Sequence, residues 1–251
     1  MLKSLLHTTS PATIDRSRIS FASLGWAVAW GTDQLASGST APALPAYVGS
    51  DALQTTVAKQ AKSSNYGCRG VSLMFDGTDD AFPVLCTAIS GLTAYTVYVV
   101  SRATILTAGG AVIFETTNAY YNKRGVVVGS SATGQVVVGT GTATTPNNKT
   151  TAAPVLERGV VSAGAFDRTL TGSAITRAYI NGVAMVAPAE TTTNTALGLN
   201  LGTGSWVGAR NNGGSAPHTG HISFVGVRSG ADSPQTVRQI SDMLAQRWCV
   251  Q

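Results

Sequence analysis

The sequence predicts an all-β protein, built as a two-sheet antiparallel sandwich with one helix at its C-terminus. Short apolar runs with the period of a strand recur from residue 71 onward, and turn residues separate them. A helical period appears only in the last segment. Charged residues make up 12% of the 251-residue chain, about half of the usual ~25%. The 28 glycines and the many β-branched residues suit strands and turns better than a helical bundle.

The N-terminal part carries weaker signals. Residues 1–20 have no clear period and contain proline, so we expect an N-terminal arm before one domain of residues 21–251. In segment 21–31 the tryptophans are spaced four apart, which leaves strand and helix both open. Residues 32–66 are rich in Ser, Thr, Ala, Pro and Gln, and predict a long surface loop with at most a brief strand.

The strand pattern becomes regular at VSLMFD (71–76), where alternate apolar residues share one face. The β-branched and aromatic run at 94–102 is typical of a central strand that is covered on both sides. Residues 141–154, with several Thr, Asn and Pro, predict a loop. Further strands are expected at 111–115, 125–129, 135–139, 159–167, 204–210 and 221–229.

Residues 174–186 give the clearest local signal. Asn181-Gly182 supplies the two residues with positive φ that a type I′ hairpin turn requires. The hairpin then pairs Ile180 with Val183, and Ala178 with Met185.

The C-terminal segment predicts an amphipathic helix. Ser233 is a favourable N-cap residue, and Pro234 suits the first helical position. Trp206 and Trp248 are both expected in the core. The apolar stripe of this helix consists of Val237, Ile240, Leu244 and Trp248.

Five segments in this order carry a family resemblance. They are FDGTDD (75–80), TVYVVSR (96–102), AYINGV (178–183), GHISFVGVRS (220–229) and QISDMLAQRW (239–248). Together they resemble the concanavalin A-like or laminin-G-like jelly rolls, especially those of structural and tail-associated proteins of tailed bacteriophages. The first 70 residues lie outside this resemblance.

The resemblance implies a jelly-roll sandwich with a non-enzymatic role in a virion, as a capsid decoration or a tail component. Such a protein is made in the cytoplasm of the bacterial host and is then located in the virion. Its N-terminal arm and low-charge faces would dock onto other virion proteins, in many copies on a symmetric particle. Its exposed loops would contact host glycans, with avidity from repetition.

Charge and cysteine usage exclude several classes of protein. The net charge is +5, but the basic residues are scattered singly, so nucleic acid is not an expected partner. No apolar run approaches ~18 residues, so membrane insertion is not expected. Cys68, Cys86 and Cys249 lack the CxxC spacing, which argues against a zinc site and against a disulfide framework. They are expected to be buried free thiols in a reducing cytoplasm.

Asp76, Asp79 and Asp80 follow a predicted strand and admit two interpretations. Asp and Gly are the usual residues of a tight turn, since Asp side chains accept hydrogen bonds from nearby N–H groups. The alternative is a metal site, although the EF-hand spacing and a downstream Glu are absent. The turn is the preferred interpretation, and no cofactor is expected.

Catalytic constellations are poorly represented. Glu115, Glu157 and Glu190 have no acidic neighbour within three residues, so the carboxylate pair of a glycosidase has no evident carrier. No G-x-S-x-G motif occurs. The expectation for His218 and His221 is an exposed position beside a strand.

Glycan binding is the remaining chemical option. An aromatic face can stack on the C–H groups of a sugar, while amides and charged groups bind its hydroxyls. Tyr120, Tyr121 and Asn122 supply this chemistry in one predicted loop, and Arg210, Asn211 and Asn212 supply it in another. Tyr and Asn are also common loop residues without any ligand. The alternatives to the virion role are therefore a stand-alone carbohydrate-binding module and, second, a glycoside hydrolase that uses Asp79, Asp80 or Glu115.

Overall fold

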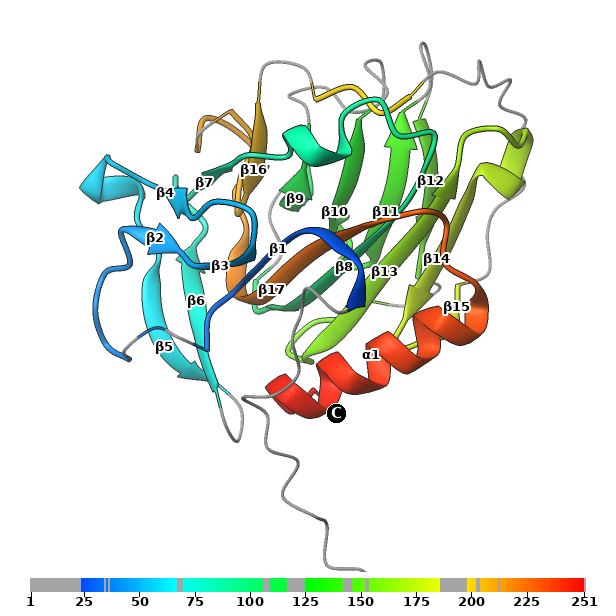
Figure 1. Cartoon of the computed structure of the whole chain (residues 1–251). Helices are drawn as coiled ribbons and strands as arrows, with labels where there is room; N and C mark the ends of the chain where they lie inside the picture. The colour runs from blue at the N-terminus through cyan, green and yellow to red at the C-terminus, as the bar shows by residue number, and fades with distance from the viewer. Residues whose placement is uncertain are drawn as a thin grey trace, which may run out of the picture.

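Two antiparallel sheets face each other, and one helix lies across the outer side of the larger sheet (Figure 1). This computed structural model confirms the predicted two-sheet sandwich with one C-terminal helix. The structure describes residues 24–33, 35, 37–66, 70–105, 109–116, 125–141, 146–151, 154–185, 198–201, 204–211 and 213–250. The predicted arm at 1–20 lies outside the described residues, so the domain boundary stays a prediction.

The larger sheet has nine strands. Its main path runs in the order β15 (Val183–Ala184), β14 (Thr176–Ile180), β13 (Val160–Asp167), β8 (Ala94–Ala103), β17 (Thr219–Ser229), β1 (Trp26–Gly31) and β3 (Ala46–Val48). Two further strands, β5 (Lys62–Tyr66) and β6 (Gly70–Asp76), join it at β17. β17 therefore pairs with β8 on one side, and with β6 and then β1 on the other.

The smaller sheet has six strands. Their order is β12 (Pro146–Thr150), β11 (Val136–Gly141), β10 (Val126–Ser130), β9 (Ala111–Glu115), β16 (Ser205–Val207) and β7 (Phe82–Val84). A separate pair consists of β2 (Ala43–Leu44) and β4 (Ala52–Leu53). Short 3-10 helices are η3 (Val57–Lys59), η4 (Thr87–Ile89) and η6 (Gly172–Ile175).

The main core fills the space between the two sheets. Because side chains alternate along a strand, Val126 and Val128 of β10 enter this core with Val136 and Val138 of β11. The residue between the first two, Val127, faces the opposite way. The outer face of the six-stranded sheet thus carries its own row of side chains.

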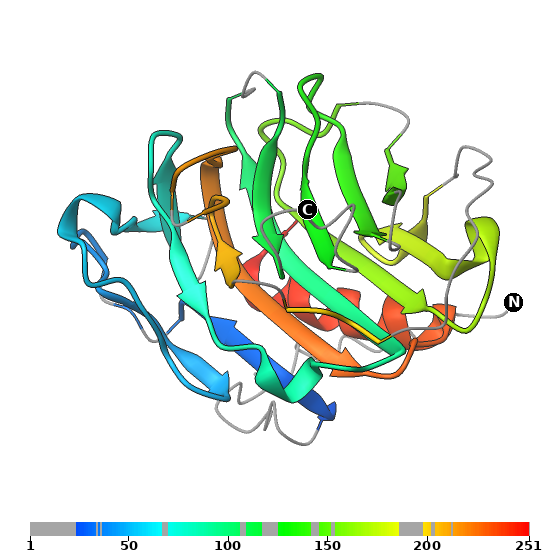
Figure 2. The same ribbon diagram turned by 90° about the horizontal axis from the view of Figure 1, so that it is seen from above.

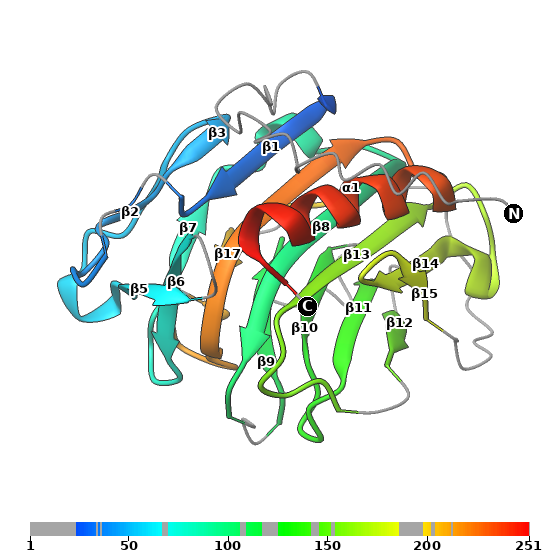
Figure 3. The same ribbon diagram turned by 90° about the horizontal axis from the view of Figure 1, so that it is seen from below.

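A second core lies between the nine-stranded sheet and α1 (Pro234–Trp248). The helix crosses β8 and β13 (Figure 3), and in the view from above the strands lie in front of it (Figure 2). The predicted stripe, including Trp248, is buried as expected. The predicted N-cap is confirmed, since Ser233 Oγ accepts a hydrogen bond from the Thr236 N–H at 3.2 Å.

The predicted hairpin is also confirmed. Asn181 and Gly182 have φ angles of 50° and 75°, as a type I′ turn requires. Ile180 lies opposite Val183, and the Met185 N–H donates to the Ala178 carbonyl at 2.8 Å.

The first segment forms strand β1 rather than a helix. Trp26 packs in the core under α1, whereas Trp30 lies in the core between the sheets. The register shift between Trp26 and Val28 explains how residues four apart reach opposite faces.

Two predicted loops contain strands. Segment 32–66 holds β2, β3, β4 and β5 together with η3, and segment 141–154 holds β12. β2, β3 and β4 have only two or three residues each, too few to show a period, and β5 and β12 are polar. The backbone hydrogen bonds of a sheet do not require an apolar pattern. The expectation of long loops was therefore wrong at both places.

The prediction for the cysteines is right at one position. Cys86 is a free, buried thiol, and burial raises its pKa to about 12. Cys249 is disulfide-bonded, so the expectation of free thiols is wrong there. Cys68 lies outside the described residues. Spacing along the chain cannot show which thiols the fold brings together. None of the described helices is long and apolar enough to cross a membrane.

The helix cap gives a direct test of this layer. Replacing Ser233 with Ala removes the acceptor for the Thr236 N–H, so we expect a loss of about 1 kcal/mol in the free energy of unfolding. Urea denaturation measures this loss. Gln235→Ala, an exposed change in the same helical turn, is the control and should stay within about 0.5 kcal/mol of the wild type. Equal stability of the two variants would contradict the capping role.

Candidate functional site

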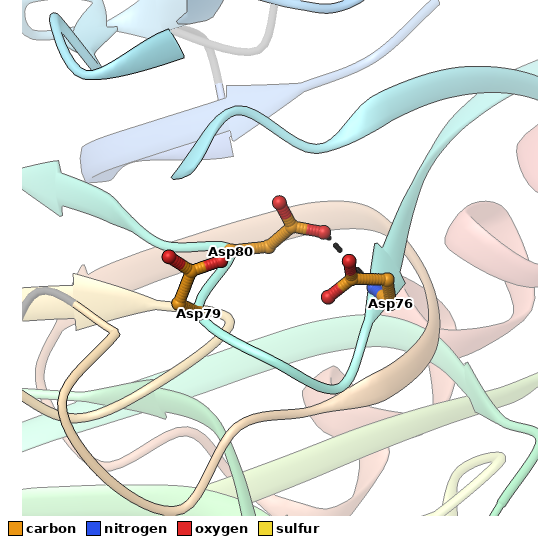
Figure 4. A group of neighbouring side chains, drawn as sticks. All are labelled: Asp76, Asp79 and Asp80. Carbon is orange, nitrogen blue, oxygen red and sulfur yellow. Dashed lines mark hydrogen bonds between the residues drawn. The ribbon is translucent and has the colours of Figure 1, made fainter. Parts of the chain in front are cut away.

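The acidic residues form a hydrogen-bonded turn between β6 and β7. Asp76 Oδ1 accepts a hydrogen bond from the Thr78 N–H at 2.8 Å, and Asp80 Oδ2 accepts one from the Asp76 N–H at 2.9 Å. Gly77 has a φ of 81°, which a side chain would strain. Figure 4 shows the Asp80 carboxylate pointing toward Asp76. These bonds account for Asp76 and Asp80 as turn residues.

The same turn brings three carboxylates together. One oxygen each from Asp76, Asp79 and Asp80 lies within 4.8 Å of the others, a spacing that could accommodate a cation. Burial raises the pKa of Asp80, and the charges of Asp76 and Asp79 add to this rise. The metal site stays a prediction, because the hydrogen bonds within the turn explain these residues by themselves.

A cavity of about 220 Å³ lies on the outer face of the six-stranded sheet. It is bounded by the outward-facing side of β9, β10 and β11, with small and apolar residues over most of its wall. The residues that line it are Gly109, Gly110, Ala111, Val112, Val127, Gly129, Ser130, Ser131, Val137, Arg210 and Ala216.

A row of outward-facing residues leads to this cavity. Trp206 of β16 lies opposite Glu115 of β9, and Glu115 lies opposite Val127 of β10. Opposite residues in neighbouring strands have Cβ atoms about 4.5–5.5 Å apart. Arg210 Nε donates to Glu115 Oε2 at 2.8 Å. An aromatic ring and an ion pair therefore lie on the same face of the sheet as the cavity.

Arg210 is held by a tight turn. Its N–H donates to the Ser215 carbonyl at 2.9 Å, and the Ser215 N–H donates back at 3.2 Å. At the tip of this turn the backbone of Gly213 lies against that of Asp79, and a Cβ atom at Gly213 would come within 2.1 Å of the Asp79 carbonyl oxygen. The turn thus contacts the acidic residues at Gly213 and the cavity at Arg210.

The predicted ligand-binding residues have different outcomes. Arg210 lines the cavity. Asn211 is exposed in the neighbouring turn, with a φ of 54°. Asn212, Tyr120, Tyr121 and Asn122 lie outside the described residues. A ligand-binding role for these residues stays a prediction.

Trp206 was expected in the core, and this was wrong. Ser205 and Val207 of β16 are buried, whereas Trp206 is only half-buried on the outer face. The alternation of strand side chains carries this signal, but it is readable only once the buried face of the strand is known. Sequence reasoning therefore missed a surface aromatic residue.

The expectation of exposed histidines was wrong as well. His218 and His221 are both buried. The ring of His218 packs edge-on against Phe75, and burial lowers its pKa to about 4. His221 Nδ1 forms a hydrogen bond with Ser72 Oγ at 2.9 Å. The folded chain covers both rings because β17 lies in the middle of the larger sheet.

Among the described residues, the carboxylate of Glu115 pairs with the cation of Arg210. This carboxylate is fully buried, and it lies outside the group formed by Asp76, Asp79 and Asp80. Within the described residues, this arrangement does not resemble the carboxylate pair of a glycosidase.

Comparisons with known proteins show the fold alone. No family model and no curated protein sequence matches the chain. Among solved structures, the CBM40 domain of Ruminococcus gnavus IT-sialidase bound to α2,3-sialyllactose is 11% identical, with a TM-score of 0.53 over 68% of this chain and 95% of that chain. The same domain bound to α2,6-sialyllactose has a TM-score of 0.50 at 10% identity, over 68% of this chain and 96% of that one.

A second likeness is to part of a larger enzyme. Trypanosoma rangeli sialidase in complex with 2,3-difluorosialic acid is 11% identical, with a TM-score of 0.57 over 88% of this chain. The match spans only 33% of the sialidase chain. These likenesses support the predicted jelly-roll resemblance in its coarse form, a β-sandwich. The link to bacteriophages stays a prediction.

The buried carboxylate of Asp80 gives a pH-dependent prediction. Folding raises the pKa of Asp80, so the folded protein disfavours the ionised carboxylate. The contribution of Asp80 to the free energy of unfolding therefore falls as the pH rises above 3.8, the ordinary pKa of this group in the unfolded chain. We expect Asp80→Asn to be more stable relative to the wild type at pH 7 than at pH 3. Urea denaturation in EDTA at both pH values measures the difference.

The control for this experiment is Asp242→Asn, which removes an exposed carboxylate from α1. The stability of this variant relative to the wild type should change less with pH. A gain for Asp80→Asn that is larger at pH 3 than at pH 7 would contradict the electrostatic analysis of the turn.

Proposed function

We propose that this chain is a non-catalytic glycan-binding domain that holds a sugar on the outer face of its six-stranded sheet. The observation that carries the proposal is the row from Trp206 through Glu115 and Arg210 to the cavity. Ligand sites are usually concave and largely apolar, with a few well-placed polar groups. This surface has that composition.

Each part of the row has a place in sugar binding. The indole of Trp206 is half-buried on this face, and an indole has an apolar ring that can stack on a sugar. Arg210 supplies hydrogen-bond donors at the edge of the cavity, and Ser130 and Ser131 supply hydroxyl groups. At about 220 Å³ the cavity is smaller than the ~300–1,000 Å³ of typical small-molecule pockets, which suits a single sugar ring better than a long oligosaccharide.

The structural comparisons support this proposal. The two Ruminococcus gnavus CBM40 structures contain sialyllactose, and this chain covers 95% and 96% of them. The likeness is one of fold, so whether this chain binds a glycan has to be tested by experiment. The buried pairing of Glu115 with Arg210 favours a binding role over glycoside hydrolysis.

A structural role in a virion is a second and compatible proposal. Its support is exposed apolar surface: Leu53 is 59%, Val57 72% and Leu85 63% exposed. The segments that carry them are joined, because Gln54 Nε2 donates to the Ala81 carbonyl at 2.6 Å and β4 contacts β7. Burying such residues in an assembly is favourable. Mass spectrometry of purified particles should then find the protein at a fixed copy number, and its absence from them would exclude this role.

Trp206 is the residue that tests glycan binding. The intact chain is screened on an array of neutral and sialylated glycans, and the affinity for the best ligand is measured by titration calorimetry. We expect Trp206→Ala to weaken binding about tenfold or more, since a lost aromatic contact of about 1.5 kcal/mol has that effect. Val183→Ala, which removes an exposed apolar residue at the β14–β15 hairpin, should bind like the wild type. Binding to no glycan, or equal binding by all three proteins, would refute the proposal.

A further inference from the structure

Arg210 is fixed in one orientation by the buried carboxylate of Glu115. The side chain of Glu115 is 0% exposed and accepts from Arg210 Nε at 2.8 Å. Two backbone hydrogen bonds to Ser215 hold the other end of the arginine. A guanidinium that is already positioned loses little conformational entropy when a ligand binds.

The bond to Glu115 leaves most of the guanidinium available. Arginine has five N–H donors, of which Nε supplies one. Among the described residues, the four donors on Nη1 and Nη2 make no hydrogen bond, and 22% of the side chain is exposed. Two parallel N–H groups in a planar fork match the two oxygens of a carboxylate.

The described residues that line the cavity carry no negative charge. Arg210 is the only charged residue among the described residues that line it. Glu115 is fully buried, so a ligand in the cavity meets the guanidinium rather than the carboxylate behind it. The lining also includes the small residues Gly110 and Gly129 and the apolar Val112, which would face the C–H groups of a sugar ring.

We propose that this site selects sugars that carry a carboxylate, and that Nη1 and Nη2 of Arg210 bind the carboxylate as a fork. The inference rests on the proposed function and specifies its ligand class. Sialic acids and uronic acids share this chemistry. In such a complex Arg210 lies between two carboxylates, the one of Glu115 behind it and the one of the ligand in front.

The experiment compares acidic and neutral sugars on the full chain. Titration calorimetry is performed with sialyllactose, a disaccharide that contains glucuronic acid, and lactose. We expect at least one acidic sugar to bind about tenfold or more tightly than lactose. A higher salt concentration should weaken the binding of the acidic sugar and leave the binding of lactose unchanged. The acidic sugar that binds identifies the source of the carboxylate.

Arg210→Lys is the informative variant. Lysine keeps the positive charge near Glu115 but lacks the fork, so the affinity for the acidic sugar should fall about tenfold or more. The affinity for lactose should fall several-fold less, because lactose carries no carboxylate for the fork to bind. Arg158→Ala, which removes an exposed arginine after the Leu156 bridge, is the control and should leave both affinities unchanged. The methyl ester of the acidic sugar tests the same contact without altering the protein, and should bind no better than lactose.

The outcomes separate this inference from the proposed function. Lactose binding as tightly as the acidic sugars, or an ester binding as tightly as its acid, would overturn the carboxylate preference and leave glycan binding intact. An equal loss of affinity for acidic and neutral sugars in a folded Arg210→Lys protein would also overturn it. Binding of none of the sugars, here or on the array, would overturn the proposed function itself.

Discussion

The pairing of β8 with β17 is the contact on which the rest of the structure depends. β8 (Ala94–Ala103) and β17 (Thr219–Ser229) pair antiparallel and lie in the middle of the larger sheet. Both faces of the pair are buried: Val97 and Val99 enter the core between the sheets, whereas Tyr98 and Val100 enter the core under α1. Each fully buried side chain of this size contributes roughly 1.5–3 kcal/mol, so one strand pair couples all three layers.

The candidate site is a consequence of the same layering. Every second side chain of the six-stranded sheet packs into the core between the sheets, so the side chains between them face outward. Val128 and Phe114 face inward as a cross-strand pair, so the next pair, Val127 and Glu115, faces outward toward the cavity. The sandwich therefore supplies a rigid platform, and the turn from Arg210 to Ser215 adds the guanidinium to it.

The ion pair between Arg210 and Glu115 is better explained by positioning than by stability. Burying two opposite charges costs several kcal/mol in desolvation, which their attraction only partly offsets. Removing one partner leaves a buried charge and typically costs about 3–5 kcal/mol. The pair thus locks the orientation of Arg210, a function that an apolar pair of the same volume would not perform. The acidic turn of Asp76, Asp79 and Asp80 contacts the turn from Arg210 to Ser215 at Gly213. In the acidic turn the carboxylates accept hydrogen bonds from backbone N–H groups.

The sequence by itself determined the features that depend on neighbouring residues. The hairpin at Asn181-Gly182, the helix that begins after Ser233 and the regular strands from residue 71 all follow from local backbone preference and side-chain period. Tertiary structure decided the rest. The strands within 32–66 exist because their backbones find partners, and His218 is buried because other segments cover it. Trp206 faces outward because its neighbour Val207 packs in the core. Arg210 pairs with Glu115, which lies 95 positions away in the chain. Such contacts join residues whose separation in sequence carries no local pattern, so only the folded arrangement of the sheets could reveal them.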